Sequence, residues 1–149
     1  MGEDEVYRGI GLAKYDPATD TNPKKQFGDS KAPFNFYPVS AVAEMALVMA
    51  QGAHKYGSFN FRETVIDTDT YTGAINRHFA LWQDGEDDDP EGGLHLAAIM
   101  ACCSLIIDAQ KTGRLKDVRS KTGTVRPALE EAGERFKAWK EDYDARTTS

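Results

Sequence analysis

The stretch that decides the fold is Asn76–Asp108, which reads NRHFALWQDGEDDDPEGGLHLAAIMACCSLIID. Apolar residues at both of its ends recur at helical spacing, and six of the eight residues from Asp84 to Glu91 are acidic. A short connection between two helices would hold these carboxylates together, and their repulsion needs an offset such as a divalent cation. We therefore expect a metal site at this connection rather than a solvated loop.

Apolar residues recur at helical spacing in several further segments from Pro38 onward. The predicted helices begin at Pro38, near residues 68–70, near residue 91 and after Pro127. The third, roughly 91–112, is apolar on nearly every side from Leu94 to Ile107, as in the centre of a bundle or an oligomer interface. No strand-like alternation of useful length is present, so the sequence predicts an all-α fold.

Composition divides the chain into three predicted parts. Residues 1–37 contain three prolines and several aromatic residues, which indicates a looped arm packed on the body. Residues 38–112 carry the helices around the acidic connection and form the predicted catalytic domain. Residues 113–149 form a linker and a C-terminal amphipathic helix.

Charge and cysteine usage exclude several classes of protein. The net charge of -6 disfavours sequence-independent binding to a nucleic-acid backbone. The sequence shows neither a membrane-spanning apolar run nor a signal peptide, so we expect neither a membrane protein nor a secreted one. Cys102 and Cys103 are adjacent in an apolar segment, which is typical of core residues in a reducing cytoplasm.

Polar residues on the helices leave two interpretations open. Glu44 and Lys55 share one stripe of the first helix, which fits either a solvated face or one that lines a cleft. His78 on its apolar face is either a hydrogen-bonded core histidine or a group that orients a metal-bound carboxylate or contacts phosphate. Glu91 and His95, four residues apart at a predicted helix start, can hold a metal or phosphate, but many ordinary helices show this spacing.

The acidic residues indicate the kind of metal and substrate. Asp87 and Asp89 are hard oxygen donors of the kind that Mg²⁺ and Mn²⁺ prefer. A polyphosphate bridged by such ions is the natural substrate of a carboxylate cluster. A phosphate-binding glycine-rich loop, a G-x-S-x-G motif and a Cys poised near a histidine are all missing from the sequence.

Three segments resemble a known family. GAHKYGSFNFRE (52–63), RHFALWQDGEDDDPEGGLHLA (77–97) and the following MACCSL are similar to the phage dATP/dGTP diphosphohydrolases. That family belongs with the MazG-like all-α nucleoside triphosphate pyrophosphohydrolases. KYD at 14–16 matches the usual opening of the family, so the resemblance covers about residues 14–112.

The resemblance implies a MazG-like helical bundle and metal-dependent cleavage of a purine deoxynucleoside triphosphate to the monophosphate and pyrophosphate. For the mechanism we expect attack of metal-activated water on the α-phosphorus, with two or three Mg²⁺ or Mn²⁺ ions neutralising the triphosphate. Dimers that complete a four-helix bundle, or tetramers of two such dimers, would bury the apolar surface of the third predicted helix. In the MazZ branch the substrate is dGTP, and the dGMP supplies synthesis of a 2-aminoadenine deoxynucleotide for modified phage DNA. A phage-encoded member would act in the host cytoplasm.

The family binds its metals through acidic residues on adjacent helices. That role maps here to Glu44, Asp87, Asp89 and Glu91, of which Glu44, Asp87 and Glu91 are also the catalytic candidates. The expected substrate contacts are Lys55, Arg62, Arg77, His78 and His95 for phosphates, and Asn60 and Trp82 for the base. The chain departs from the family in lacking paired glutamates on one helix and in having Leu96 and Ile99 where members often carry histidines.

Two other functions remain open at this point. One is a broad house-cleaning pyrophosphatase for non-standard nucleotides, and the other is a non-enzymatic helical adaptor whose acidic loop binds a partner or Ca²⁺. An EF-hand is excluded, because the acidic residues lack the D-x-D-x-D-G register. Incubation with the four dNTPs and Mn²⁺ distinguishes an enzyme from an adaptor.

Overall fold

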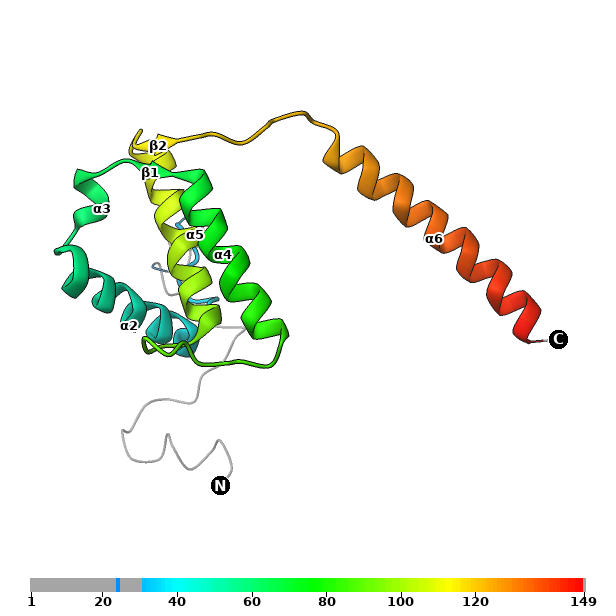
Figure 1. The fold of residues 1–149 in the computed structure, drawn as a ribbon, viewed down its shortest axis with the longest axis horizontal. Coiled ribbons are helices and arrows are strands. Elements are labelled where there is room, and N and C mark those ends of the chain that lie inside the picture. The colour runs from blue at the N-terminus through cyan, green and yellow to red at the C-terminus, as the bar shows by residue number, and fades with distance from the viewer. Residues whose placement is uncertain (1–23, 25–30, 149) are drawn as a thin grey trace, which may run out of the picture. The chain divides into compact units, whose positions relative to one another are not determined.

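The computed structural model describes Lys24 and residues 31–148, and most of this part of the chain is helical (Figure 1). The long helices are α2 (Val39–Tyr56), α4 (Thr68–Gln83), α5 (His95–Lys111) and α6 (Val125–Thr147). A single turn, α3 (Asn60–Glu63), follows α2, and the two-residue strands β1 (Ile66–Asp67) and β2 (Leu115–Lys116) pair in parallel. The predicted all-α fold is confirmed, and the strands are too short to change it.

The chain divides into two compact units, Met1–Pro38 and Val39–Ser149. In the first unit, the described residues 31–38 form turns, and the rings of Phe34 and Tyr37 meet edge to face with centroids 6.4 Å apart. Most of the predicted arm lies outside the described residues. Its packing on the body therefore stays a prediction, as does the division into three functional parts.

The helix boundaries follow from local chemistry. α2 begins directly after Pro38 and ends at Tyr56, before Gly57, whose φ of +97° is left-handed, as the sequence predicts. α4 begins after Asp67, whose carboxylate accepts hydrogen bonds from the backbone N–H groups of Asp69 and Thr70. These two bonds lower the pKa of Asp67.

The third predicted helix begins later than expected. α5 starts at His95 rather than near Glu91, because Gly92 and Gly93 have φ values of +99° and +90° that a right-handed helix cannot continue. Glu91 therefore lies in the loop before the helix. The expectation that Glu91 and His95 project from one helix start is wrong.

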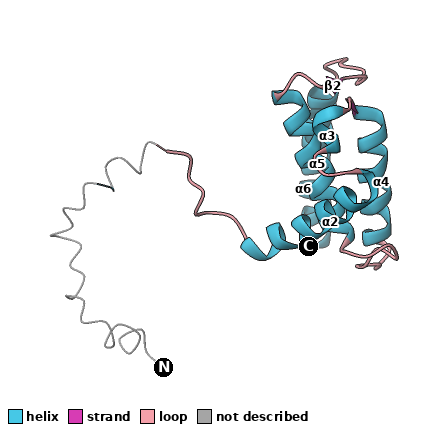
Figure 2. Ribbon diagram, turned by 90° about the vertical axis from the view of Figure 1, so that its left-hand side faces the viewer, coloured by secondary structure: helices cyan, strands magenta, loops and turns pink. Residues whose placement is uncertain are grey.

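α5 is the central element of the second unit. It lies beside α4 and α2 and also contacts α3 and both strands (Figures 1 and 2). The buried apolar residues are Ile66, Ala97, Ala98, Ala101 and Ala109. Because most of them are alanines, neighbouring helices approach α5 closely. The remaining faces of α5 keep large apolar side chains exposed, among them Leu96 and Ile107.

The strands tie the end of α5 to the start of α4. Ile66 donates its N–H to the carbonyl of Arg114, and the Thr68 hydroxyl accepts the N–H of Val118. The two helices therefore run antiparallel, since their other ends are joined by the acidic loop. In the described part of the chain, no helix combines the length and the apolar character that crossing a membrane requires.

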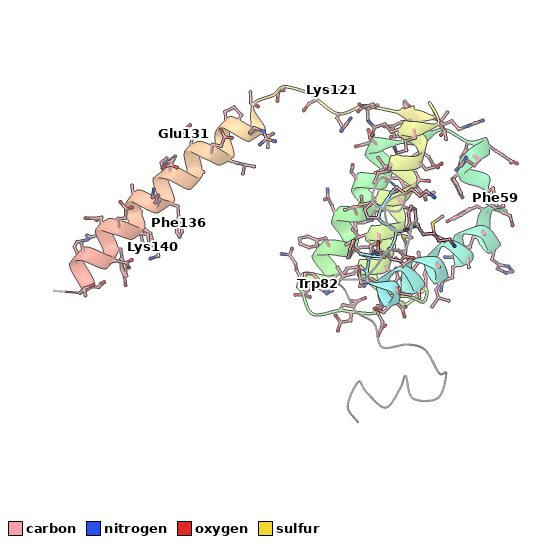
Figure 3. All side chains as sticks on the ribbon, turned by 180° about the vertical axis from the view of Figure 1, so that it is seen from behind. Phe59, Trp82, Lys121, Glu131, Phe136 and Lys140 are labelled. Atoms are coloured by element: carbon pink, nitrogen blue, oxygen red, sulfur yellow. The ribbon has the colours of Figure 1, made fainter. Side chains whose placement is uncertain are left out.

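Every side chain of α6 is exposed. Its aromatic residues form a stacked series, with ring centroids of Phe136 and Trp139 5.6 Å apart and those of Trp139 and Tyr143 5.3 Å apart. Figure 3 labels Phe136 on this helix. The sequence predicts this amphipathic helix, although it begins at Val125 and so carries Pro127 in its first turn.

Candidate functional site

A cavity of about 310 Å³ opens between α2, α3, α4, α5 and the acidic loop. Its lining includes the polar residues Gln51, Lys55, His78, Asp89 and Glu91, and the less polar residues Tyr56, Phe59, Phe61, Tyr71, Cys102 and Leu105. Tyr71 precedes His78 by seven residues on α4, and Cys102 follows His95 by seven residues on α5. Because the two helices are antiparallel, the Tyr71–Cys102 end lies about 10 Å from the histidine end.

Three side chains converge at the histidine end of the cavity. The Nδ1 atoms of His78 and His95 lie 2.9 Å apart, and Asp89 Oδ2 lies 3.6 Å from the first and 3.9 Å from the second. His95 is almost fully buried, and its Nε2 lies 3.2 Å from Glu86 Oε1. We call His78, Asp89 and His95 the histidine–aspartate cluster.

The acidic loop holds Asp89 in place by its own hydrogen bonds. The N–H of Glu91 donates to Asp89 Oδ1 at 2.9 Å, which leaves Oδ2 directed at the histidines. The N–H of Asp89 donates to the Gly93 carbonyl, and the N–H of His95 donates to the Asp87 carbonyl. The turn that starts α5 therefore also places the carboxylate.

Two glycines bring this loop against α2. A Cβ atom on Gly93 would lie 3.0 Å from Val48 Cγ2, and one on Gly92 would lie 3.0 Å from Gln51 Nε2. The Lys55 ammonium donates a short hydrogen bond to Glu91, and this bond raises the pKa of Lys55. Both side chains are largely exposed, so the ion pair adds little stability, but it directs a cation toward the loop.

The structure brings five of the predicted site residues into the lining of the cavity, namely Lys55, Asn60, His78, Asp89 and Glu91. His95 joins them through the histidine–aspartate cluster. Glu44 is partly buried on α2, one turn before Val48, and is not among the residues that line the cavity. Asp87 is exposed and contributes its carbonyl group to the loop.

The other three predicted contacts lie elsewhere. Arg62 pairs with Asp108 at 2.8 Å. Arg77 is exposed on α4 and is not among the residues that line the cavity. Burial raises the pKa of the Cys102 thiol, and the charge of Arg77 opposes this rise. Trp82 stacks on Phe79 near the end of α4, well separated from the Phe59 turn (Figure 3).

Sequence reasoning missed several residues of the site. Nothing in the sequence distinguishes Glu86 from its acidic neighbours, because its contact with His95 depends on the course of the loop. Helical spacing does place Gln51 on the stripe of Glu44 and Lys55, and Tyr71 on the face of His78. It does not identify either side chain as part of a site.

The histidine–aspartate cluster fits a divalent metal ion. One nitrogen from each imidazole and one carboxylate oxygen all lie within 4.8 Å of one another. Two nitrogens and one oxygen suit Mn²⁺ and its transition-metal neighbours better than Mg²⁺, which prefers oxygen alone. The contact from Glu86 to the second nitrogen of His95 is the support that metal-binding histidines usually have.

Comparison with known proteins gives two matches. A family described as "dATP/dGTP diphosphohydrolase, N-terminal" matches residues 21–119, which include the whole cavity. A "dATP/dGTP diphosphohydrolase" of Salmonella phage PMBT28 is 29% identical over 113 residues, which cover 68% of this chain and 38% of that relative. The chain thus spans well under half of the relative's length. No solved structure matches the chain.

Proposed function

We propose, since the chain belongs to the dATP/dGTP diphosphohydrolase family, that it hydrolyses a purine deoxynucleoside triphosphate, dGTP or dATP, to the monophosphate and pyrophosphate. The observation that carries this proposal is the convergence of His78, Asp89 and His95 at one end of a cavity inside the matched range. A cavity of about 310 Å³ is at the lower end of the size range of small-molecule sites.

The two ends of the cavity suit the two ends of a nucleotide. Lys55 and the histidine–aspartate cluster offer cationic and metal-binding groups, which favour the triphosphate. Tyr71 and Phe61 offer ring faces, and Asn60 offers an amide that can both donate and accept hydrogen bonds, which favours the base. Arg77, which directly precedes His78 on α4, remains a proposed phosphate contact.

His78, Asp89 and His95 would hold one metal ion. Asp87, Glu91 and Glu44 would hold metal together with Asp89, as the family resemblance implies. Bound ions would neutralise the triphosphate and activate water for attack at the α-phosphorus. The mixed nitrogen and oxygen donors lead us to expect higher activity with Mn²⁺ than with Mg²⁺. We expect two or three ions, because one cluster of three donors cannot span three phosphates.

A supply of dGMP for 2-aminoadenine deoxynucleotide synthesis is the biological role that the MazZ branch suggests. This role requires that dGTP be a better substrate than dATP. A broad house-cleaning enzyme would instead accept non-standard and pyrimidine nucleotides at similar rates.

We also propose that the protein assembles as a dimer or tetramer. Large apolar side chains on α2, α4 and α5 are more than two-fifths exposed in the single chain, including Leu47, Phe79, Leu96 and Ile107. Such surfaces usually mark an interface. Light scattering at micromolar concentration should return a multiple of 16.5 kDa, and the monomer mass would contradict the proposal.

The reaction is tested with each of the four dNTPs and either Mn²⁺ or Mg²⁺. Reactions are quenched with a chelator, and the products are separated by anion-exchange chromatography without added pyrophosphatase. We expect dGMP and pyrophosphate as the first products. Accumulation of dGDP or orthophosphate would overturn the one-step route, equal turnover of dCTP and dTTP would support a house-cleaning role, and no turnover would favour an adaptor.

A further inference from the structure

The turn that joins α2 to α3 forms one wall of the cavity. Gly57, Phe59, Asn60 and Phe61 all line it, and Figure 3 shows Phe59 at this turn. Phe59 has a φ of +59°, a left-handed conformation that disfavours a bulky side chain. The local sequence alone therefore does not fix this wall in place.

Most hydrogen bonds of this segment stay within it. The N–H groups of Asn60, Arg62 and Thr64 donate to the carbonyls of Gly57, Phe59 and Asn60, respectively. Within residues 31–148, the side-chain bond that joins the segment to another element runs from Arg62 to Asp108 on α5. A helix of one turn held by local bonds opens easily, so a contact to α5 has a large effect on its position.

The Arg62–Asp108 ion pair connects α3 to α5. Arg62 Nη2 lies 2.8 Å from Asp108 Oδ1, and the guanidinium also lies over the ring of Phe61 at 5.6 Å. Asp108 Oδ2 is buried, and none of the described residues donates a hydrogen bond to it. If Arg62 turned away to hold a phosphate, the half-buried Asp108 carboxylate would lose the charged partner that it has among the described residues, which is unfavourable.

We propose that the Arg62–Asp108 ion pair is a clasp that holds the Phe59–Phe61 wall closed on the cavity, so that Arg62 acts on the nucleotide through this wall rather than by touching phosphate. Arg62 is then a positioning residue. Its effect on a nucleotide rests on the proposed function, whereas its effect on the wall does not.

Two consequences separate a clasp from a phosphate contact. A clasp changes the affinity for dGMP and for a triphosphate by the same factor, because the wall faces the base end of the cavity. A phosphate contact changes chiefly the affinity for the triphosphate. In addition, the effect of removing Arg62 should vanish when Asp108 has already been neutralised, since the two residues act as a unit.

The experiment compares Arg62→Gln, Asp108→Asn, the double variant and Arg62→Lys with the unchanged full-length protein. The matched control is Arg119→Gln, because the Arg119–Asp117 pair has a similar distance of 2.7 Å and similar exposure but does not line the cavity. Amide hydrogen exchange of residues 58–64 is measured without nucleotide. Calorimetry gives the dissociation constants of dGMP and of a non-hydrolysable dGTP analogue.

We expect exchange of residues 58–64 to be about two- to fivefold faster in Arg62→Gln and in Asp108→Asn, no faster in the double variant than in either single one, and unchanged in Arg119→Gln. Arg62→Lys should lie between Arg62→Gln and the unchanged protein. Both nucleotides should bind more weakly by a similar factor, with kcat unchanged and KM raised. These results support the clasp.

Unchanged exchange in Arg62→Gln would overturn the proposal. So would a loss of affinity confined to the triphosphate, or one that persists in full when Asp108 is already Asn. If neither nucleotide binds the unchanged protein, the proposed function fails, and the exchange data still decide whether the clasp exists.

Discussion

The Nδ1 atoms of His78 on α4 and His95 at the start of α5 lie 2.9 Å apart, and Asp89 faces both. Two ring nitrogens at this distance cannot both carry hydrogen, so at least one presents its lone pair to the other or to a cation. The pairing exists because α4 packs along α5 and because the loop between them turns back through Gly92 and Gly93. The geometry of the histidine–aspartate cluster is therefore a product of helix packing.

Removal of one imidazole should weaken metal binding. We expect His78→Gln to raise the dissociation constant for Mn²⁺ by about tenfold or more, because one of three converging donors is lost. Paramagnetic resonance of free Mn²⁺ during titration measures this directly. His54→Gln is the control, since His54 is exposed on α2 and outside the cluster, and an equal loss in both variants would contradict the assignment.

Neutralising Asp89 should abolish most turnover. Asp89→Asn is expected to lower kcat/KM by about 10²-fold, a loss of about 3 kcal/mol in transition-state stabilisation. Asp88→Asn is the matched control, because Asp88 is the adjacent exposed residue and is not part of the cluster. Dialysed protein assayed at saturating Mn²⁺ gives the comparison. Near-normal turnover of Asp89→Asn would exclude it as a metal ligand in the reaction.

Replacement by alanine should lower the unfolding free energy by different amounts at two glycines of the loop. Gly85 and Gly93 both have left-handed φ values, but a Cβ on Gly85 meets open space whereas one on Gly93 presses on Val48. Gly85→Ala should therefore cost about 1 kcal/mol in unfolding free energy from backbone strain alone. Gly93→Ala should cost about 1 kcal/mol more. Denaturant unfolding, with a cycle through Val48→Ala, measures the coupling, and equal costs at both glycines would contradict close packing of the loop on α2.

Long elements with a regular apolar pattern could be predicted from the sequence. α2 ends directly before Gly57 as expected, because the left-handed residue that follows a helix is usually glycine. α3 and the strand pair could not be predicted, since segments of two to four residues show no periodicity. Their positions depend on long-range contacts such as Ile66 to Arg114.

The site could be predicted in composition but not in geometry. The acidic loop and its neighbouring histidines are visible in the sequence, which names Asp87 and Asp89 alike as metal ligands. Only the structure shows that Asp89 is the loop carboxylate that faces both histidines. That choice depends on a bond from the Glu91 N–H that holds Asp89, and on Gly92 and Gly93 ending the loop. The same turn sets the start of α5 at His95. The helical spacing of apolar residues does not predict this turn.

The cap of α4 should make stability depend on pH. Hydrogen bonds from the backbone of Asp69 and Thr70 lower the pKa of Asp67, so its contribution is fully present above its unfolded pKa of about 3.9 and is lost as pH falls through the lower folded value. Asp67→Ala should lower Tm by about 3–6 °C at pH 7 and by much less at pH 2. Asp67→Asn keeps an acceptor, so it should retain most of the stability without the pH dependence. A deficit in Asp67→Ala that is the same at both pH values would show that capping by the carboxylate is not the cause.

Glu44 carries the last prediction, which concerns the face of α2 that meets the acidic loop. Glu44 precedes Val48 by four residues and Gln51 by seven, so all three share one side of the helix. Val48 and Gln51 lie against Gly93 and Gly92 of the loop, and Glu44 is itself only partly exposed. Helical geometry therefore directs Glu44 toward the loop end of the site.

A carboxylate placed beside other carboxylates destabilises the metal-free protein and binds metal when it is supplied. We expect Glu44→Gln to leave Tm unchanged or slightly higher without metal, to remove part of the rise in Tm that Mn²⁺ produces, and to lower kcat by about tenfold or more. Glu134→Gln on the exposed helix α6 should change none of these quantities. Full activity of Glu44→Gln together with an unchanged metal-induced rise in Tm would place Glu44 on the protein surface and leave the loop with Asp89 as its main carboxylate.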